Sequence, residues 1–117
     1  MPRFLVHIHT GPADANKATL GCLVALAAAR KGHDVTVFLA GDGVHLLAHA
    51  GIEGEGTGRL SEHLTALSEM GVRFRVSGLS AKARGYDETL LEGHAAEFAM
   101  PDALIDLAQA ADTVLCY

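Results

Sequence analysis

The segment 72–85, VRFRVSGLSAKARG, decides how the rest of the chain is interpreted. Apolar residues alternate with arginines over residues 72–76, and this period of two predicts a strand. Residues 79–84 predict a short helix, and a glycine that commonly ends helices follows them. The two residues between, Ser77 and Gly78, therefore lie at the carboxyl end of a strand and directly before a helix. In parallel α/β sheets, ligands gather at that place, and free backbone N–H groups there favour an anion or a thiolate.

The same order of strand and helix recurs along the chain. Short apolar and β-branched runs predict strands, and apolar residues at helical spacing predict helices. The predicted strands are residues 4–9, 34–40, 72–76, 95–100 and 113–117, and the predicted helices are residues 16–31, 44–50, 59–70, 79–84 and 102–110. Strands that alternate with helices through short connections form parallel βαβ units. We therefore predict one α/β domain over residues 1–117, a three-layer α/β/α arrangement around a mainly parallel, flavodoxin-like sheet of five strands.

The helix predicted at residues 16–31 has apolar residues on nearly all of its sides. Such a helix is buried on more than one side. We expect a sheet on one side of it and a second subunit on the other. Asp14, just before it, is a candidate N-cap.

Segment 51–58, GIEGEGTG, holds four glycines in eight residues. Glycine costs backbone entropy when it is ordered, and clusters of it mark loops. We expect a mobile loop without regular structure. The segment lacks the G-K-[ST] of a phosphate-binding loop, and its two glutamates would repel a phosphate.

Composition excludes several classes of protein. Half of the residues are hydrophobic and a fifth are charged, which excludes a largely disordered chain. The net charge of −5 argues against nucleic acid as the main partner. No apolar run is long enough to span a membrane and no signal peptide is recognisable, so we expect a cytoplasmic protein that contacts no membrane. Cys22 and Cys116 have neither disulfide-framework nor zinc spacing. We expect two reduced thiols and no cofactor.

A parallel sheet would bring the segments that follow its strands to one edge. These are residues 10–16, 41–44, 77–80 and 100–102. Any site should lie there, because ligands bind outside the carboxyl ends of parallel strands. The candidate ligand-binding residues are Thr10, Asp42, Gly43, Ser77, Gly78 and Ser80.

Two pairs of histidines have spacings that a divalent metal accepts. His7 and His9 share one face of the first predicted strand, and His45 and His49 lie four residues apart on a predicted helix. The two pairs stand on separate elements, and a metal needs three or four convergent ligands. We favour a polar strand end and a solvated helix face, and a histidine-based metal-binding protein remains an alternative.

The layout resembles the DsrE/DsrF-like (YchN-like) family of small sulfur-relay proteins. The similarity is carried by DGV at residues 42–44, KARG at residues 82–85 and the acidic pair at residues 87–88. The stretch KGHDVTVFLAGDGV, residues 31–44, is also similar to the family. The resemblance covers nearly the whole chain. It implies a homo-oligomer, a trimer or a hexamer, and a sulfur-relay protein as a partner.

The resemblance also implies an acceptor cysteine that this chain lacks. Sulfur-transferring members carry a cysteine eight residues before the ARG glycine, and that position is Ser77. Related members have a second cysteine three residues later, at the position of Ser80. A persulfide carrier needs a thiolate, and a serine hydroxyl cannot carry a sulfane sulfur. The activity of the family therefore does not transfer to this chain at the expected residue.

Three functional hypotheses follow. The first is a non-catalytic subunit, or a module that binds a small ligand or a protein at the Ser77 edge. The second is a sulfurtransferase that uses Cys116 or the thiol of a partner. The third is the metal-binding protein. Ser77 as a helix cap is favoured over Ser77 as a hydrolytic nucleophile, because RVSGL lacks the G-x-S-x-G pattern. We expect Arg84 to be a structural ion-pair partner.

Overall fold

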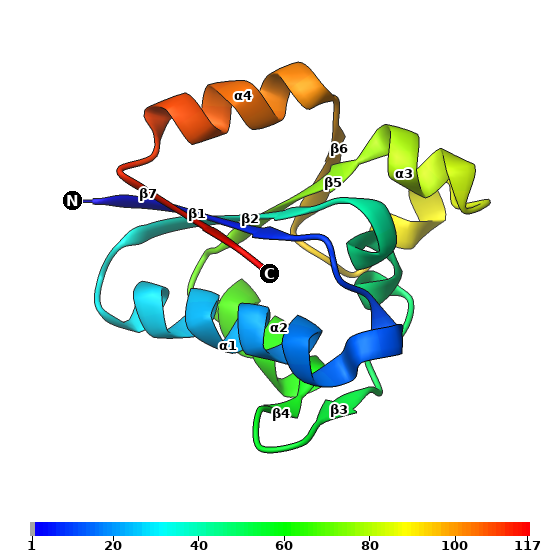
Figure 1. Ribbon diagram of the computed structural model, residues 1–117, viewed down its shortest axis with the longest axis horizontal. Coiled ribbons are helices and arrows are strands. Elements are labelled where there is room, and N and C mark those ends of the chain that lie inside the picture. The colour runs from blue at the N-terminus through cyan, green and yellow to red at the C-terminus, as the bar shows by residue number, and fades with distance from the viewer. Residues whose placement is uncertain (1) are drawn as a thin grey trace.

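The computed structural model describes residues 2–117 and contains a five-stranded sheet with helices on both faces (Figure 1). The elements in chain order are β1 (Arg3–Ile8), η1 (Pro12–Asp14), α1 (Ala15–Arg30), β2 (Asp34–Leu39), η2 (Gly41–Leu47), β3 (Glu53–Gly54), β4 (Gly58–Arg59), α2 (Leu60–Glu69), β5 (Arg73–Ser77), α3 (Gly78–Ala83), η3 (Glu88–Leu91), β6 (Ala96–Ala99), α4 (Pro101–Ala110) and β7 (Thr113–Cys116). The large sheet has the order β6-β5-β2-β1-β7, and all of its neighbouring strands are parallel. The predicted flavodoxin-like α/β fold is confirmed.

The two faces of the sheet are covered unequally. Helices α1 and α2 lie on one face, α4 lies alone on the other, and α3 projects at one end of the sheet (Figure 1). The main core forms between the sheet and the α1–α2 layer. Leu5, Phe38 and Ala99 form a smaller core beneath α4. None of the ten residues of α4 is fully buried. The face under α4 is therefore the less protected one.

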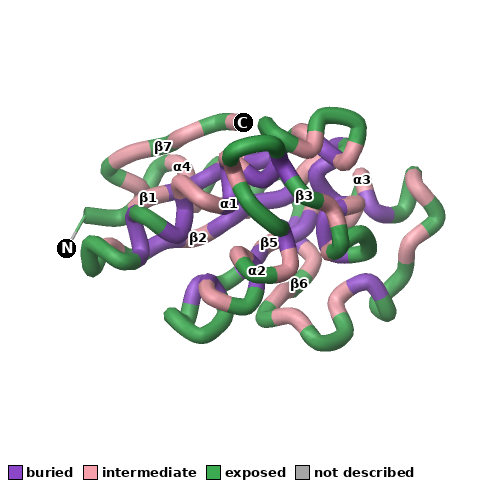
Figure 2. The backbone as a smooth tube through the Cα atoms, turned by 90° about the horizontal axis from the view of Figure 1, so that it is seen from below, coloured by how far each residue is buried: buried purple, intermediate pink, exposed green. Residues whose placement is uncertain are grey.

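Burial along the strands follows from this arrangement. In β2 the last three residues, Val37, Phe38 and Leu39, are all buried, because both faces of a central strand are covered. In β5 the apolar Phe74 and Val76 are buried while the arginines between them are less so. Figure 2 shows the buried backbone concentrated in the middle of the molecule, whereas β7 at the edge is only partly buried.

Helix α1 is buried on two sides, as its apolar surface predicted. The second side packs against α2 and against β3. Part of that side is therefore covered by the same chain, and a second subunit against α1 stays a prediction. Sequence periodicity shows that a surface needs cover, but it does not show whether the cover comes from the same chain.

Residues 51–58 include most of a short two-stranded hairpin, so the prediction that they hold no regular structure is wrong. Strands β3 and β4 pair antiparallel there. The Nδ2 group of Asn16 donates to the carbonyl of Glu55 at 2.5 Å and to Oγ1 of Thr57 at 3.2 Å. Oγ1 of Thr19 lies 2.6 Å from Oγ1 of Thr57. Hydrogen bonds from α1 thus offset the entropy cost of ordering the glycines.

The short helix predicted at residues 44–50 is the 3-10 helix η2, which begins at Gly41 and ends at Leu47. Its start packs tightly against the end of β1. A Cβ atom on Gly43 would collide with the carbonyl oxygen of Ile8, and the N–H of Ala40 donates to that same carbonyl at 3.1 Å. Within residues 2–117, no helix has the length and apolar character that a bilayer crossing requires.

Candidate functional site

The corner at the end of β5 forms where the sequence predicted it. Ser77 is the last residue of β5 and the N-cap of α3. Its Oγ atom accepts a hydrogen bond from the backbone N–H of Ser80 at 3.1 Å. This bond satisfies one of the N–H groups that a helix start leaves free. The expected capping role of Ser77 is confirmed.

The second serine of the corner also makes a structural contact. Oγ of Ser80 accepts a hydrogen bond from the backbone N–H of Gly41 at 2.9 Å, which ties α3 to the start of η2. On the other side of the corner, a Cβ atom on Gly78 would lie 3.8 Å from the carbonyl oxygen of Ala99. The corner is therefore held between the ends of β2 and β6.

An ion pair closes the corner on its outer side. Nε of Arg84 donates to Oδ1 of Asp42 at 3.0 Å, and Nη1 of Arg84 donates to the carbonyl of Ser80 at 3.1 Å. The Asp42 side chain is 62% exposed, so the free energy gained from the pair is small. Its effect is to orient η2 against α3. The prediction that Arg84 is an ion-pair partner is confirmed.

A histidine–tyrosine contact lies beside this pair, and no sequence pattern predicted it. Nδ1 of His45 and the hydroxyl of Tyr86 are 2.7 Å apart. Nε2 of His45 lies 3.9 Å from Oδ1 of Asp42. The tyrosine follows the corner helix by a few residues and reaches back to η2, so only the folded chain brings the two together. Asp42 and His45 also line a shallow hollow of about 300 Å³ with Pro12, Ala13 and His49.

The structure gathers most of the candidate ligand-binding residues. Ser77, Ser80 and Asp42 belong to the hydrogen-bonded corner, and Gly78 begins its helix. Gly43 packs instead against the end of β1, at the carbonyl of Ile8. Thr10 lies in the turn after β1 and is half-buried. Its side chain takes no part in the hydrogen bonds that join the other candidates within the described residues. Asp14, the predicted cap of α1, accepts from the N–H of Lys17 at 3.1 Å.

The two cysteines lie in different environments, and neither is at the corner. Cys22 is fully buried in α1, and burial raises the pKa of its thiol to about 12. Cys116 is exposed on β7. Three strand spacings separate β7 from β5, which amounts to about 14 Å at roughly 4.8 Å per strand. Cys116 of the same chain therefore cannot replace a thiol at Ser77.

The histidine pairs do not converge. His7 packs edge-on against Phe38, and its buried Nε2 has no hydrogen-bond partner within residues 2–117. Burial first, and then the charge of His9, lowers the pKa of His7. The rings of His45 and His49 are 6.0 Å apart. In the part of the chain that the structure describes, no three His, Cys, Asp or Glu side chains are arranged to hold a metal ion.

Comparisons with known proteins agree with the observed fold. Residues 3–117 match the DsrE/DsrF-like family. The crystal structure of the YchN protein from E. coli superposes with a TM-score of 0.77 over 100% of both chains, at 19% sequence identity. That identity is low, so the superposition shows a shared fold. A search of curated proteins finds no match. On the family match, which spans almost the whole sequence, the chain belongs to the DsrE/DsrF-like family.

Proposed function

We propose that this chain is a binding subunit of the sulfur-relay type that does not accept sulfane sulfur at its corner. Membership of the DsrE/DsrF-like family supports a place in the sulfur-relay superfamily. The hydroxyl of Ser77 stands at the position that the resemblance assigns to the acceptor cysteine. An alkoxide does not form near neutral pH, and oxygen lacks the soft nucleophilicity that thiol exchange requires.

The observation that carries the proposal is the hydrogen bond from the Ser80 N–H to Oγ of Ser77. In a thiolate-bearing relative of this geometry, the same N–H would stabilise the sulfur anion. In this chain the N–H of Ser80 donates to the hydroxyl of Ser77 and caps α3. The corner thus keeps the donor and lacks the nucleophile, which fits a subunit that presents this edge to a partner or a small ligand.

The test is incubation of the wild-type protein with a persulfide donor, followed by intact-mass measurement and peptide mapping. We expect no sulfur on Ser77 or Ser80, and none on the buried Cys22. Stoichiometric persulfide on Cys116 would contradict the non-catalytic role and favour a sulfurtransferase that uses this exposed thiol.

We further propose that the protein forms a homo-oligomer, a trimer or a hexamer. Support comes from the thinly covered face of the sheet, where Ile105 on α4 is 65% exposed and Met100 just before it is 49% exposed. Val114 is 42% exposed and pairs in register with Leu5, which packs beneath α4. Light scattering coupled to gel filtration tests this. A clean monomer at micromolar concentration would refute it, and Ile105→Lys should shift the mass toward monomer.

A further inference from the structure

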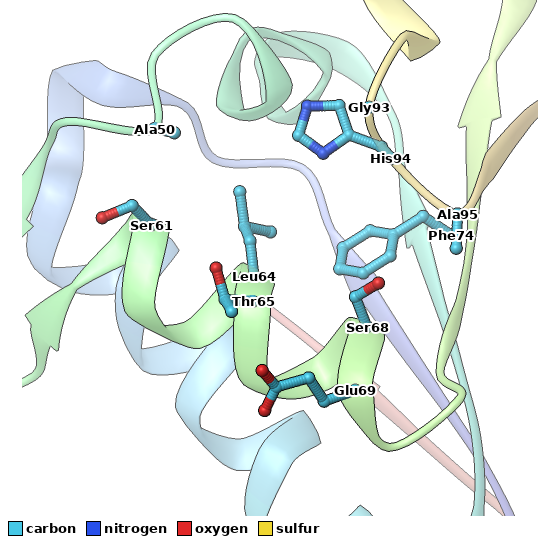
Figure 3. A pocket seen from close by; sticks show the side chains of 10 residues that line it. All are labelled: Ala50, Ser61, Leu64, Thr65, Ser68, Glu69, Phe74, Gly93, His94 and Ala95. Atoms are coloured by element: carbon cyan, nitrogen blue, oxygen red, sulfur yellow. The ribbon is translucent and has the colours of Figure 1, made fainter.

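A hollow lies at the other end of β5 from Ser77. It opens between α2 and the segment just before β6, and its volume is about 390 Å³ (Figure 3). Small-molecule sites in proteins begin at roughly this size, about 300 Å³. The hollow is lined by Ala50, Ser61, Leu64, Thr65, Ser68, Glu69, Phe74, Gly93, His94 and Ala95.

The hollow exists because the crossover from β5 to β6 is poorly filled. A parallel crossover usually lays a helix across the sheet. Here the crossover contains only the six-residue α3 and the four-residue η3. Residues 93–95 then lead into β6 without forming a helix. Space is left over Leu64 and Phe74, which form an apolar floor.

The walls of the hollow are polar and carry negative charge. Thr65, Ser68 and Glu69 of α2 stand along one side, and the imidazole of His94 stands on the opposite side (Figure 3). Among the described residues that line it, none is a lysine or an arginine. An anion would therefore meet the carboxylate of Glu69 with no lysine or arginine beside it, whereas an ammonium group would be attracted.

We propose that this hollow binds a small aromatic amine, a planar ring that carries an ammonium group. The ring lies between the apolar floor of Leu64 and Phe74 and the imidazole of His94, because aromatic surfaces favour stacked or edge-on contact. The ammonium group pairs with Glu69, and the hydroxyl of Ser68 accepts one of its remaining hydrogens. This site is separate from the Ser77 corner and does not depend on the proposed function.

Two probes with the same ring and opposite charge test the ligand class. Tyramine carries an ammonium group, and 3-(4-hydroxyphenyl)propionate carries a carboxylate on a chain of equal length. In ¹H–¹⁵N NMR titrations, tyramine should shift amide signals of α2 and of residues 93–95 in a saturable way, with a dissociation constant on the order of millimolar. The carboxylate probe should bind at least about fivefold more weakly, which corresponds to the upper range for an exposed ion pair.

Two matched variants test the named contact. Glu69→Gln removes the carboxylate at the hollow and should weaken tyramine binding about two- to fivefold, the range of an exposed ion pair. Glu62→Gln removes a second exposed carboxylate of α2 that does not line the hollow, and it should leave binding unchanged. Ser68→Leu should fill the hollow and abolish the shifts, with circular dichroism confirming the fold. The proposal is overturned by shifts that map elsewhere, by equal binding of both probes, or by no shift at about 10 mM.

Discussion

The two ends of β5 differ in how their polar groups are used. At the carboxyl end, the hydroxyls of Ser77 and Ser80 accept hydrogen bonds from backbone N–H groups, and Arg84 binds both Asp42 and a carbonyl. At the amino end, the hydroxyls of Thr65 and Ser68 face an open hollow. At the Ser77 corner, the donors and acceptors satisfy one another. In the hollow, the hydroxyls of Thr65 and Ser68 can contact a ligand.

A thiol placed at each end of β5 tests this difference most directly. Ser77→Cys should accept sulfur from a persulfide donor and react quickly with iodoacetamide at about pH 7, because the Ser80 N–H should lower its pKa below about 8.5. Ser68→Cys should react as an ordinary exposed thiol. Peptide mapping assigns the modified residue. Equal rates for the two variants would show that the corner does not stabilise a thiolate.

Glycine substitutions test how tightly the corner is packed. Gly43→Ala places a Cβ atom against the carbonyl oxygen of Ile8, so we expect the free energy of unfolding to fall by about 2 to 3 kcal/mol. Gly51→Ala meets no atom within 4 Å and should raise the stability by up to about 1 kcal/mol. Urea denaturation measures both. A stable Gly43→Ala variant would mean that η2 can move away from β1.

The loss of the cap should have a smaller effect. Ser77→Ala removes the acceptor for the Ser80 N–H and should cost about 1 kcal/mol of stability. Ser68→Ala leaves an exposed helical position with a better helix former, so its effect should stay within about 0.5 kcal/mol. Paired urea titrations decide this. If both variants have the same stability, the Ser77 cap contributes nothing to the free energy of unfolding.

The smallest expected effect concerns pH and His7, which lies on the face of the sheet under α4. Burial lowers its folded-state pKa below the usual 6.5, so the unfolded chain binds the proton more readily. The stability that neutral His7 contributes is complete above about pH 6.5 and is lost as the pH falls below that value. His7→Leu should flatten the decline between about pH 6.5 and 5. An identical pH profile for both proteins would exclude His7 as the cause.

Short-range sequence signals predicted the helix caps correctly. Ser77 and Asp14 are caps because a serine or aspartate before a helix can accept from a free N–H of its first turn. The sequence predicted that Arg84 forms an ion pair. It did not predict that the partner is Asp42, which lies 42 positions away. The contact between His45 and Tyr86 had no local signal at all.

Sequence patterns were enough to predict the alternation of strands and helices, the parallel sheet and the position of the Ser77 corner. These follow from periodicity and capping, which act over a few neighbouring residues. Tertiary structure alone decided that α2 covers the second side of α1, that Asn16 and Thr19 order the glycine-rich hairpin, and that a hollow remains beside Phe74. Each of these features depends on side chains that are far apart in the sequence and come into contact only when the elements pack. Local propensity and residue spacing do not predict such contacts.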